Sequence, residues 1–336
     1  MKHIYFHVGM PKTGSTSLQE FLWTNKNTLE EAGVGFFTPK DGAWRELRAN
    51  AEFLLKGYEI RLPEFAEYAK EYDTLILTEE LLWFYAIENP YLWKKVYAII
   101  NSCIKEDFII YPVVYLRRQD EWILSWWKER VNGLHPYLGS FREMLEEQKK
   151  IGGLDYSKQL NELTSVFGKD HIIVRIYDRE LMTHGDICID FMDALGLPWN
   201  DGYRLGHESN PSLTLDAANA MHLINSGAVP YDSPDKLRLS LRSAATIYSM
   251  MFPEKERTHM LDARELAELM SFCEDSNRMV SEDFLEGVPL FSDKIYPYAL
   301  WEKTPAETLR IAEDLIRLSK TSNKVHEQIM NSLKRQ

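Results

Sequence analysis

The segment GMPKTGSTS, residues 9 to 17, combines the residue types of a loop that binds an anion. Gly9 and Gly14 have the spacing of the GxxxxGK[ST] phosphate loop, and they follow a short apolar run and precede an amphipathic one. In such a loop, successive backbone N–H groups point into a concavity at the positive end of a helix. A loop that only caps a helix is the alternative. The residues that we expect to bind the anion are Lys12, Thr13, Gly14, Ser15, Thr16 and Ser17.

The position of the lysine separates this loop from that of a nucleoside triphosphatase. In a triphosphate loop the lysine follows the second glycine, whereas here Ser15 occupies that place and Lys12 precedes Gly14 by two residues. A lysine inside the loop would stand over a 5′ phosphate rather than along the β and γ oxygens. No acidic partner that would hold a metal beside this loop is evident, so we expect no required metal.

The segment PKTGSTSLQ resembles the 5′-phosphosulfate loop of sulfotransferases that use 3′-phosphoadenosine 5′-phosphosulfate (PAPS). The order of strand, Pro-Lys-Thr-Gly, two hydroxyl residues and helix is the same. The resemblance implies that PAPS is the co-substrate and that adenosine 3′,5′-bisphosphate is its product. PAPS carries a 3′ phosphate that ATP lacks, so a PAPS site needs a second cationic group to bind it.

The segment YLRRQDEWILSWW, residues 115 to 127, supplies such a group. Arg117 ends a long apolar run and offers a forked, permanently charged donor, and Ser125 lies about two helical turns later. This pair resembles the family's 3′-phosphate motif, although Gln119 stands where the family often has proline. Surface pairing of the arginines with nearby acids is the alternative. The segment VRIYDRELMTHGDICIDFMDALGLP, residues 174 to 198, also resembles a segment of this family. The resemblance implies that Tyr177 packs on the adenine, and a place in the hydrophobic core is the alternative.

An acceptor hydroxyl must lose a proton during transfer, and a positioned base typically contributes about 10²- to 10⁴-fold. Glu79 and Glu80 follow the apolar run TLILT, where the carboxyl end of a parallel strand would face the binding crevice. Both are candidate catalytic bases, and acids at a helix N-terminus are the alternative. His7, near the end of the first apolar run, is the other contender, although a core histidine is the simpler interpretation.

The elements that position these residues follow from the hydrophobic pattern. Short runs rich in β-branched and aromatic residues predict strands at 3–8, 74–78, 108–117 and 171–177, and periodic segments such as 92–105 and 157–168 predict helices between them. This alternation predicts an α/β fold with a P-loop-like central parallel sheet flanked by helices. Helical patterns dominate after about residue 185. We expect one domain over 1–336, with the α/β core at about 1–200 and a helical extension at about 201–336, or else a separate C-terminal domain.

The composition restricts the partners. The 336 residues are 45% hydrophobic with a net charge of -12, which favours a large buried core and disfavours nucleic acid as a partner. The N-terminus lacks a small-residue cleavage site, and no run approaches the ~20 apolar residues of a membrane span. Three widely spaced cysteines suggest neither zinc nor disulfides. We expect a cytoplasmic protein, and the sequence leaves its oligomeric state open.

Together the sequence predicts a PAPS-dependent O-sulfotransferase in which Lys12 stabilises the leaving phosphate and a glutamate removes the proton. The resemblance to bacterial carbohydrate-type members, which extends to HESNPSLTLDAANAMHLIN (207–225), favours a saccharide or glycolipid acceptor over another small hydroxyl compound. A nucleotide-dependent phosphotransferase and a non-catalytic adenosine bisphosphate-binding protein are the alternatives. The aromatic and basic residues that would line a sugar-stacking cleft, unless they belong to the core, are Trp44, Arg45, Arg48, Trp83, Tyr85, Trp126 and Trp127.

Overall fold

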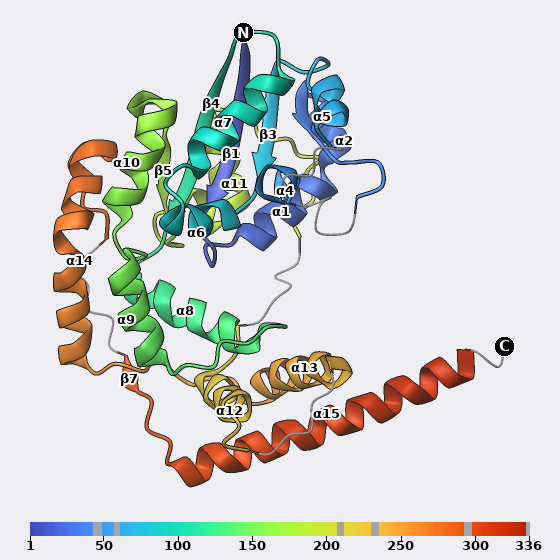
Figure 1. Cartoon of the computed structure of the whole chain (residues 1–336), viewed down its shortest axis with the longest axis vertical. Coiled ribbons are helices and arrows are strands. Elements are labelled where there is room, and N and C mark those ends of the chain that lie inside the picture. Colours follow the sequence, from blue (N-terminus) through green and yellow to red (C-terminus); the bar gives the residue numbers. More distant parts are fainter. Residues whose placement is uncertain (43–48, 57–60, 207–211, 230–234, 292–297, 334–336) are drawn as a thin grey trace. The chain divides into compact units, whose positions relative to one another are not determined.

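The computed structural model describes residues 1–42, 49–56, 61–206, 212–229, 235–291 and 298–333. They form two compact units, each built from separate stretches of chain (Figure 1). The first unit takes in Met1–Arg118, Gln148–Ser209 and Cys273–Asp293, and the second takes in Gln119–Glu147, Asn210–Phe272 and Lys294–Gln336. The chain therefore passes from one unit to the other several times.

The first unit contains a five-stranded parallel sheet in the order β2-β3-β1-β4-β5. Its strands are β1 (Lys2–Gly9), β2 (Val34–Phe36), β3 (Thr74–Thr78), β4 (Phe108–Leu116) and β5 (Ile173–Ile176). This sheet and the helices beside it confirm the predicted α/β class. Four of the strands match the predicted apolar runs, while the short edge strand β2 was not predicted.

Because the strands are parallel, their carboxyl ends lie at one edge of the sheet. The loop at 9–17 begins at the end of β1, and Glu79 directly follows β3. Arg117 directly follows β4, and Tyr177 directly follows β5. The backbone continues the pairing beyond two of the strands, since Glu79 N–H donates to His7 O at 3.0 Å and Tyr177 N–H donates to Leu116 O at 2.8 Å. The sheet thus brings four predicted segments to the same edge.

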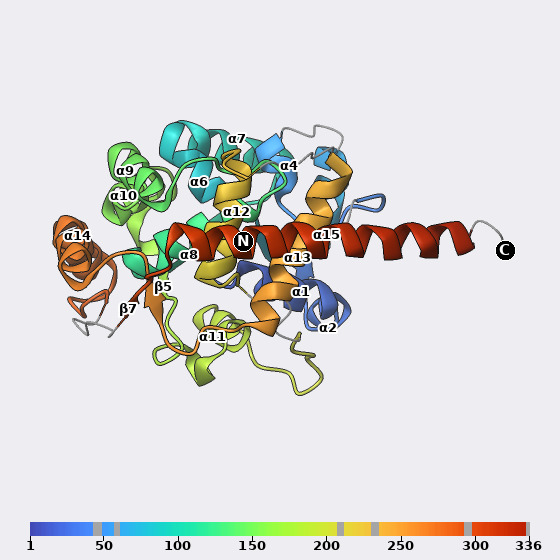
Figure 2. The ribbon, with the colours of Figure 1, turned by 90° about the horizontal axis from the view of Figure 1, so that it is seen from below.

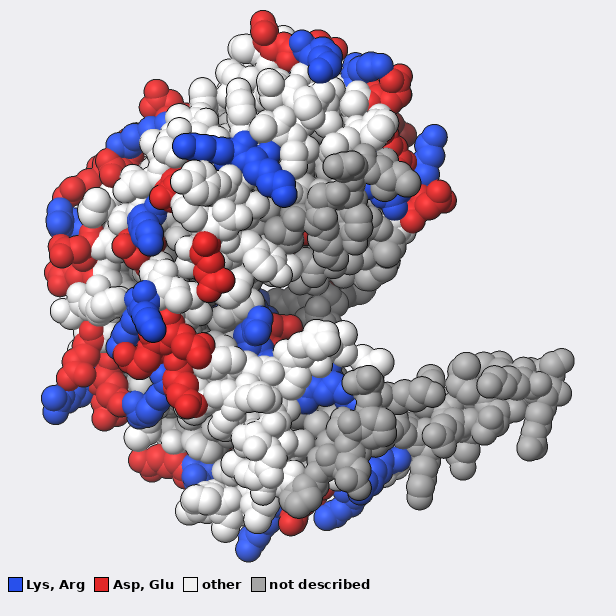
Figure 3. All heavy atoms as spheres, in the orientation of Figure 1, with Lys and Arg blue, Asp and Glu red and all other residues white. Residues whose placement is uncertain are grey.

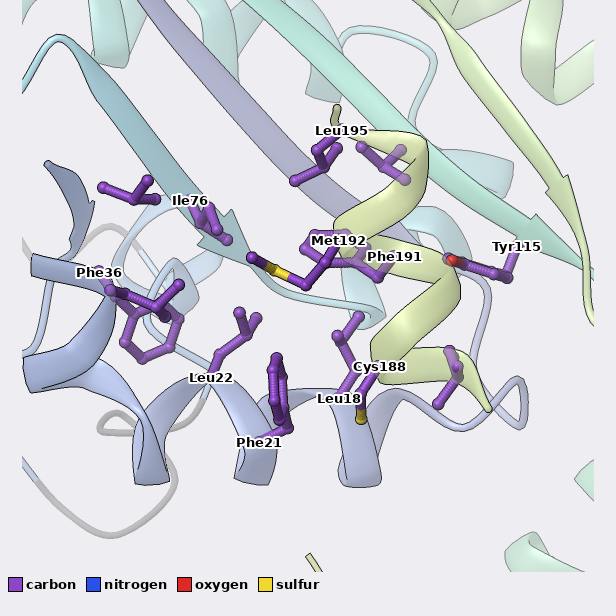
Figure 4. Close-up of a cluster of buried hydrophobic side chains, with 14 of the residues drawn as sticks. Leu18, Phe21, Leu22, Phe36, Ile76, Tyr115, Cys188, Phe191, Met192 and Leu195 are labelled. Atoms are coloured by element: carbon purple, nitrogen blue, oxygen red, sulfur yellow. The ribbon is translucent and has the colours of Figure 1, made fainter. Parts of the chain in front are cut away.

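One face of the sheet packs against α1 (Ser15–Thr24) and α11 (Ile187–Ala194). Figure 4 shows apolar side chains from both helices meeting those of the strands. The buried cluster includes Leu18, Phe21, Leu22, Phe36, Ile76, Tyr115, Phe191, Met192 and Leu195. This packing fixes the helix that follows the loop against the sheet.

A buried polar network joins α11 to β4 and to the edge strand β5. Asp190 is fully buried, and its carboxylate accepts hydrogen bonds from Tyr115 Oη at 2.7 Å, from Arg175 Nε at 3.0 Å and from the Thr183 N–H at 2.9 Å. Burial alone would raise the pKa of Asp190, but the Arg175 guanidinium and the other donors outweigh burial and hold the pKa below its ordinary value. The carboxylate is therefore charged at neutral pH and holds α11 in place.

The opposite face is covered by α6 (Leu81–Glu88), α7 (Leu92–Cys103) and α10 (Tyr156–Phe167). Their apolar residues recur at three and four positions, as the sequence predicted for α7 and α10. Asp155 caps α10 by accepting the Lys158 N–H at 3.1 Å. The first unit also contains α2 (Lys26–Glu31), α4 (Glu52–Lys56), α5 (Leu62–Tyr68), and the single turns Lys169–His171 and Thr183–Gly185.

The second unit is mainly helical. It contains α8 (Gln119–Asn132), α12 (Leu215–Asn225), α13 (Asp235–Met251), α15 (Pro305–Leu333) and the short strands β6 (Thr258–His259) and β7 (Ala299–Leu300). Two further helices, α9 (Phe141–Ile151) and α14 (Ala263–Phe284), begin in the second unit and end in the first. Figure 2 shows α15 crossing α12 and α13, against which it packs, and its Ala312 and Leu315 are fully buried.

His259 organises part of the core of the second unit. The ring is fully buried, its Nδ1 accepts the Leu261 N–H at 3.0 Å, and its Nε2 lies 3.2 Å from Asp120 O. Since Nδ1 is an acceptor, Nε2 carries the proton and donates to that carbonyl. Burial lowers the pKa of His259 to about 4, so the ring is neutral at pH 7.

Charged side chains of both signs are interspersed over the described part of the face shown in Figure 3. The net charge of -12 is consistent with this mixed surface. Over the described residues, no helix combines the length and the apolar character that crossing a membrane requires.

Candidate active site

The loop begins at Gly9, where only glycine fits. The residue has a φ of +126°, and a Cβ there would lie 2.7 Å from Trp83 Cβ and 2.8 Å from Glu80 O. Both distances are far shorter than real Cβ contacts, so the backbone of Gly9 passes directly against the turn between β3 and α6. The start of the anion loop and the backbone of Glu80 are therefore in contact.

Gly14 ends the loop and precedes α1. It has a left-handed φ of +76°, which glycine adopts without a steric penalty, and no side chain caps the helix at this residue. The first-turn N–H groups of a helix have no partner within that helix, and α1 has no acidic residue in its first turn. The N-terminus of α1 thus keeps the positive partial charge that favours an anion.

Thr13 has a structural role within the loop. Its hydroxyl donates to Met10 O at 2.6 Å and the residue is fully buried. Met10 N–H in turn lies 3.4 Å from Tyr115 O, which ties the loop to β4. The Thr13 hydroxyl is therefore directed inward and stabilises the loop.

Arg117 meets the loop from the end of β4. Its Nη1 donates to Lys12 O at 3.2 Å, and its own carbonyl accepts the Tyr156 hydroxyl at 2.8 Å. Lys12 has a positive φ of 69° and is partly buried. The two cations that were predicted to bind the two ends of one nucleotide thus belong to segments joined by a direct hydrogen bond.

Tyr177 lies between these groups. The Arg117 guanidinium carbon is 5.7 Å from the centroid of its ring, a cation–π distance. A Cβ on Gly14 would lie 3.0 Å from both Tyr177 Cε2 and Ile187 Cδ1. The structure therefore brings Lys12, Gly14, Arg117 and Tyr177 together at the carboxyl edge of the sheet.

The two adjacent glutamates have different environments. Glu79 is fully buried, and its Oε1 accepts the Leu81 N–H of α6 at 3.0 Å. Glu80 is partly exposed, and its carboxylate accepts a hydrogen bond from the Gln19 amide of α1. Only Glu80 combines exposure with a contact to the helix that opens at the anion loop. The sequence did not single out Gln19, because no local pattern relates it to a residue 61 positions away.

His7 is fully enclosed. Its Nδ1 lies 2.9 Å from Thr78 Oγ1, and its ring packs edge-on against Tyr115 and Phe191. Burial lowers the pKa of His7 to about 4, so the ring is neutral at pH 7. With no exposed surface, His7 has no direct path to an acceptor hydroxyl, and its environment is that of a core histidine.

Ser125 and the aromatic residues of the predicted cleft have the following environments. Ser125 is the seventh residue of α8, which agrees with its predicted place two turns into a helix. It belongs to the second unit. Trp83, Trp126 and Trp127 are buried, which makes them core rather than sugar-stacking residues, whereas Tyr85 is exposed. Trp44, Arg45 and Arg48 lie outside the described residues, and so do positions 207–211 of the stretch that resembles bacterial sulfotransferases.

A metal site was not predicted from the sequence. Within the described ranges, no three His, Cys, Asp or Glu side chains are grouped so that they would hold a metal ion. The polar groups near the loop are backbone N–H groups, hydroxyls, the cations Lys12 and Arg117, and the Glu80 carboxylate. This donor set suits an anionic ligand.

Comparisons with known proteins give two likenesses. No family model matches the chain. An uncharacterized protein of Archaeoglobus fulgidus is 38% identical over 113 residues, which are 34% of this chain and 30% of that protein's own length. The chain is also similar to the crystal structure of a sulfotransferase from Alicyclobacillus acidocaldarius, with 16% identity and a TM-score of 0.38 over 67% of this chain and 94% of the other. Neither likeness assigns an activity to this chain.

Proposed function

We propose that this chain is a sulfotransferase that moves a sulfuryl group from PAPS to an acceptor hydroxyl on a carbohydrate or glycolipid. The observation that carries the proposal is the hydrogen bond from Arg117 to Lys12 O, which joins the end of β4 to the anion loop. Two cations from separate strand ends suit a nucleotide with two separate anionic groups. A triphosphate loop would need only one such group, placed directly after Gly14.

Each group of the donor has a proposed partner. The N–H groups and hydroxyls from Gly14 to Ser17 hold the 5′-phosphosulfate at the N-terminus of α1, together with Lys12. Arg117 binds the 3′ phosphate through its guanidinium. Tyr177 packs against the adenine, a role supported by its place beside Arg117 and Gly14.

The reaction needs one base and one group that stabilises the leaving phosphate. The acceptor oxygen attacks sulfur, the new O–S bond forms as the bond from sulfur to the 5′-phosphate oxygen breaks, and the acceptor proton passes to a carboxylate. We assign that carboxylate to Glu80, because Glu79 is fully buried while Glu80 is partly exposed beside the loop. Negative charge grows on the leaving phosphate, where Lys12 and the loop N–H groups stabilise it.

Nucleotide binding tests the donor assignment without knowledge of the acceptor. Thermal unfolding is followed with adenosine 3′,5′-bisphosphate, ADP and ATP, each with and without Mg²⁺. The proposal expects the bisphosphate to raise the unfolding temperature most, independently of metal. A phosphotransferase would instead respond to ATP with Mg²⁺ and tolerate Arg117→Ala. A response to the bisphosphate no larger than that to ADP would sink the proposal.

Turnover separates an enzyme from a protein that only binds the bisphosphate. The chain is incubated with sulfate-labelled PAPS and a panel of p-nitrophenyl glycosides and oligosaccharides. Glu80→Gln should lower kcat by about 10²-fold or more while bisphosphate binding is kept. Glu79→Gln is the matched substitution at the buried neighbour. If Glu79→Gln abolished turnover with an unchanged fold and Glu80→Gln did not, the base would be Glu79.

A further inference from the structure

We propose that Gln19 is a positioning residue that holds the Glu80 carboxylate in the orientation for proton transfer, an inference that rests on the proposed function. Gln19 belongs to α1, the helix whose N-terminus is the anion loop, and lies four residues after Ser15. Its side chain is buried, with 5% of its surface exposed. One helix would thereby bind the donor at its first turn and orient the base from its second.

The Gln19 amide makes two hydrogen bonds. Its Nε2 donates to Glu80 Oε2 and lies 3.4 Å from Thr78 Oγ1. An ionised carboxylate only accepts hydrogen bonds, so the NH₂ group must face Glu80, and its second hydrogen is available for Thr78. Glu80 directly precedes α6 and Thr78 ends β3, so one amide reaches both sides of the turn after β3.

The network continues to His7. Thr78 Oγ1 accepts from Gln19 and also lies 2.9 Å from His7 Nδ1, within hydrogen-bond distance of that nitrogen. Burial lowers the pKa of His7 to about 4, so the ring is neutral at pH 7. His7, a candidate base by sequence, is the buried end of the network that fixes Gln19.

The network explains how a partly exposed carboxylate acquires a fixed orientation. A glutamate side chain has three rotatable bonds, and a base must be within hydrogen-bond reach of the proton that it removes. The Gln19 side chain is fixed at its base by α1 and near its tip by Thr78, whose backbone N–H also donates to Asn50 Oδ1 at 2.8 Å. A displacement of about 1 Å at such a group can cost about 10²-fold in rate.

The test removes the amide donor and keeps the side-chain length. Gln19→Met should lower kcat for transfer to the p-nitrophenyl glycosides by about 10- to 100-fold and leave the dissociation constant of adenosine 3′,5′-bisphosphate within about twofold. In a Glu80→Gln background, the same substitution should change kcat by less than about twofold, because the carboxylate it positions is gone. Gln159→Met replaces a buried glutamine of α10 and should leave kcat at the wild-type value.

The outcomes separate this inference from the proposed function. If wild-type protein transfers sulfate and Gln19→Met keeps its kcat, the role of Gln19 is overturned and the proposed function stands. A Gln19→Met loss of equal size in both backgrounds, with weakened bisphosphate binding, would also overturn it, because a general loss of structure acts that way. A wild-type protein that binds the bisphosphate and transfers nothing would remove the proposed function itself.

Discussion

Replacing Gly9 by alanine should be among the most damaging single substitutions in the loop. The φ of +126° is strained for any residue with a Cβ, and such strain costs roughly 1–3 kcal/mol. The new Cβ would also lie 2.7 Å from Trp83 Cβ and 2.8 Å from Glu80 O, atoms that cannot move without the backbone. Overpacking of this kind costs roughly another 1–3 kcal/mol, which gives a total of about 4 kcal/mol.

Urea unfolding of the full chain measures this loss, and Gly33→Ala supplies the control. Gly33 has a φ of +81°, and a Cβ there would meet no atom within 4 Å, so only the strain remains. Its cost should be about 1 kcal/mol. Gly9→Ala should also lower kcat, because relief of the clash displaces Glu80. Equal losses of stability in the two variants would refute the close contact between the loop and the turn after β3.

Three further predictions concern buried polar groups. Acidification from pH 6.5 to 4 should destabilise the chain, because the pKa of His7 and of His259 is lowered to about 4 in the folded state while the unfolded chain takes up these protons near 6.5. Each histidine should cost up to about 3 kcal/mol of stability. If the free energy of unfolding of His7→Phe depended on pH as in the wild type, this prediction would be contradicted. Asp190→Asn should lower the free energy of unfolding in urea by about 2 kcal/mol. This value is smaller than for a fully buried ion pair, because the Arg175 side chain is one-third exposed. An unchanged stability would show that the network does not hold α11. Thr13→Val should cost about 1–2 kcal/mol by leaving a loop carbonyl without its donor, and Thr13→Ser should recover most of it.

Local pattern was enough to predict most of the sheet. The strands β1, β3, β4 and β5 are each four to nine residues long and rich in β-branched and aromatic residues, so the sequence pattern indicates them. The edge strand β2 has only three residues, Val34–Phe36, with a glycine at its centre. Its conformation depends on pairing with β3, which no short window of sequence encodes.

The sequence predicted which segments at the strand ends would form the site, but not which of their side chains would contact one another. Gly14 and Arg117 stand out by residue type and by their place after apolar runs. The inward hydroxyl of Thr13 and the pairing of Gln19 with Glu80 depend on distances between segments far apart in the chain. The same reason explains why Glu79 and Glu80 were indistinguishable by sequence, since both follow one strand and differ only in burial.

Calorimetric titration with adenosine 3′,5′-bisphosphate and adenosine 5′-monophosphate tests the central claim most directly. Wild-type protein should bind the bisphosphate roughly 10- to 100-fold more tightly, the contribution of a charge-assisted hydrogen bond to the extra phosphate. Arg117→Ala should bring the two affinities close to each other, whereas Lys12→Ala should weaken both and keep their ratio. Equal affinities in the wild type, or an Arg117→Ala loss that is the same for both ligands, would contradict the assignment of Arg117 to a 3′ phosphate.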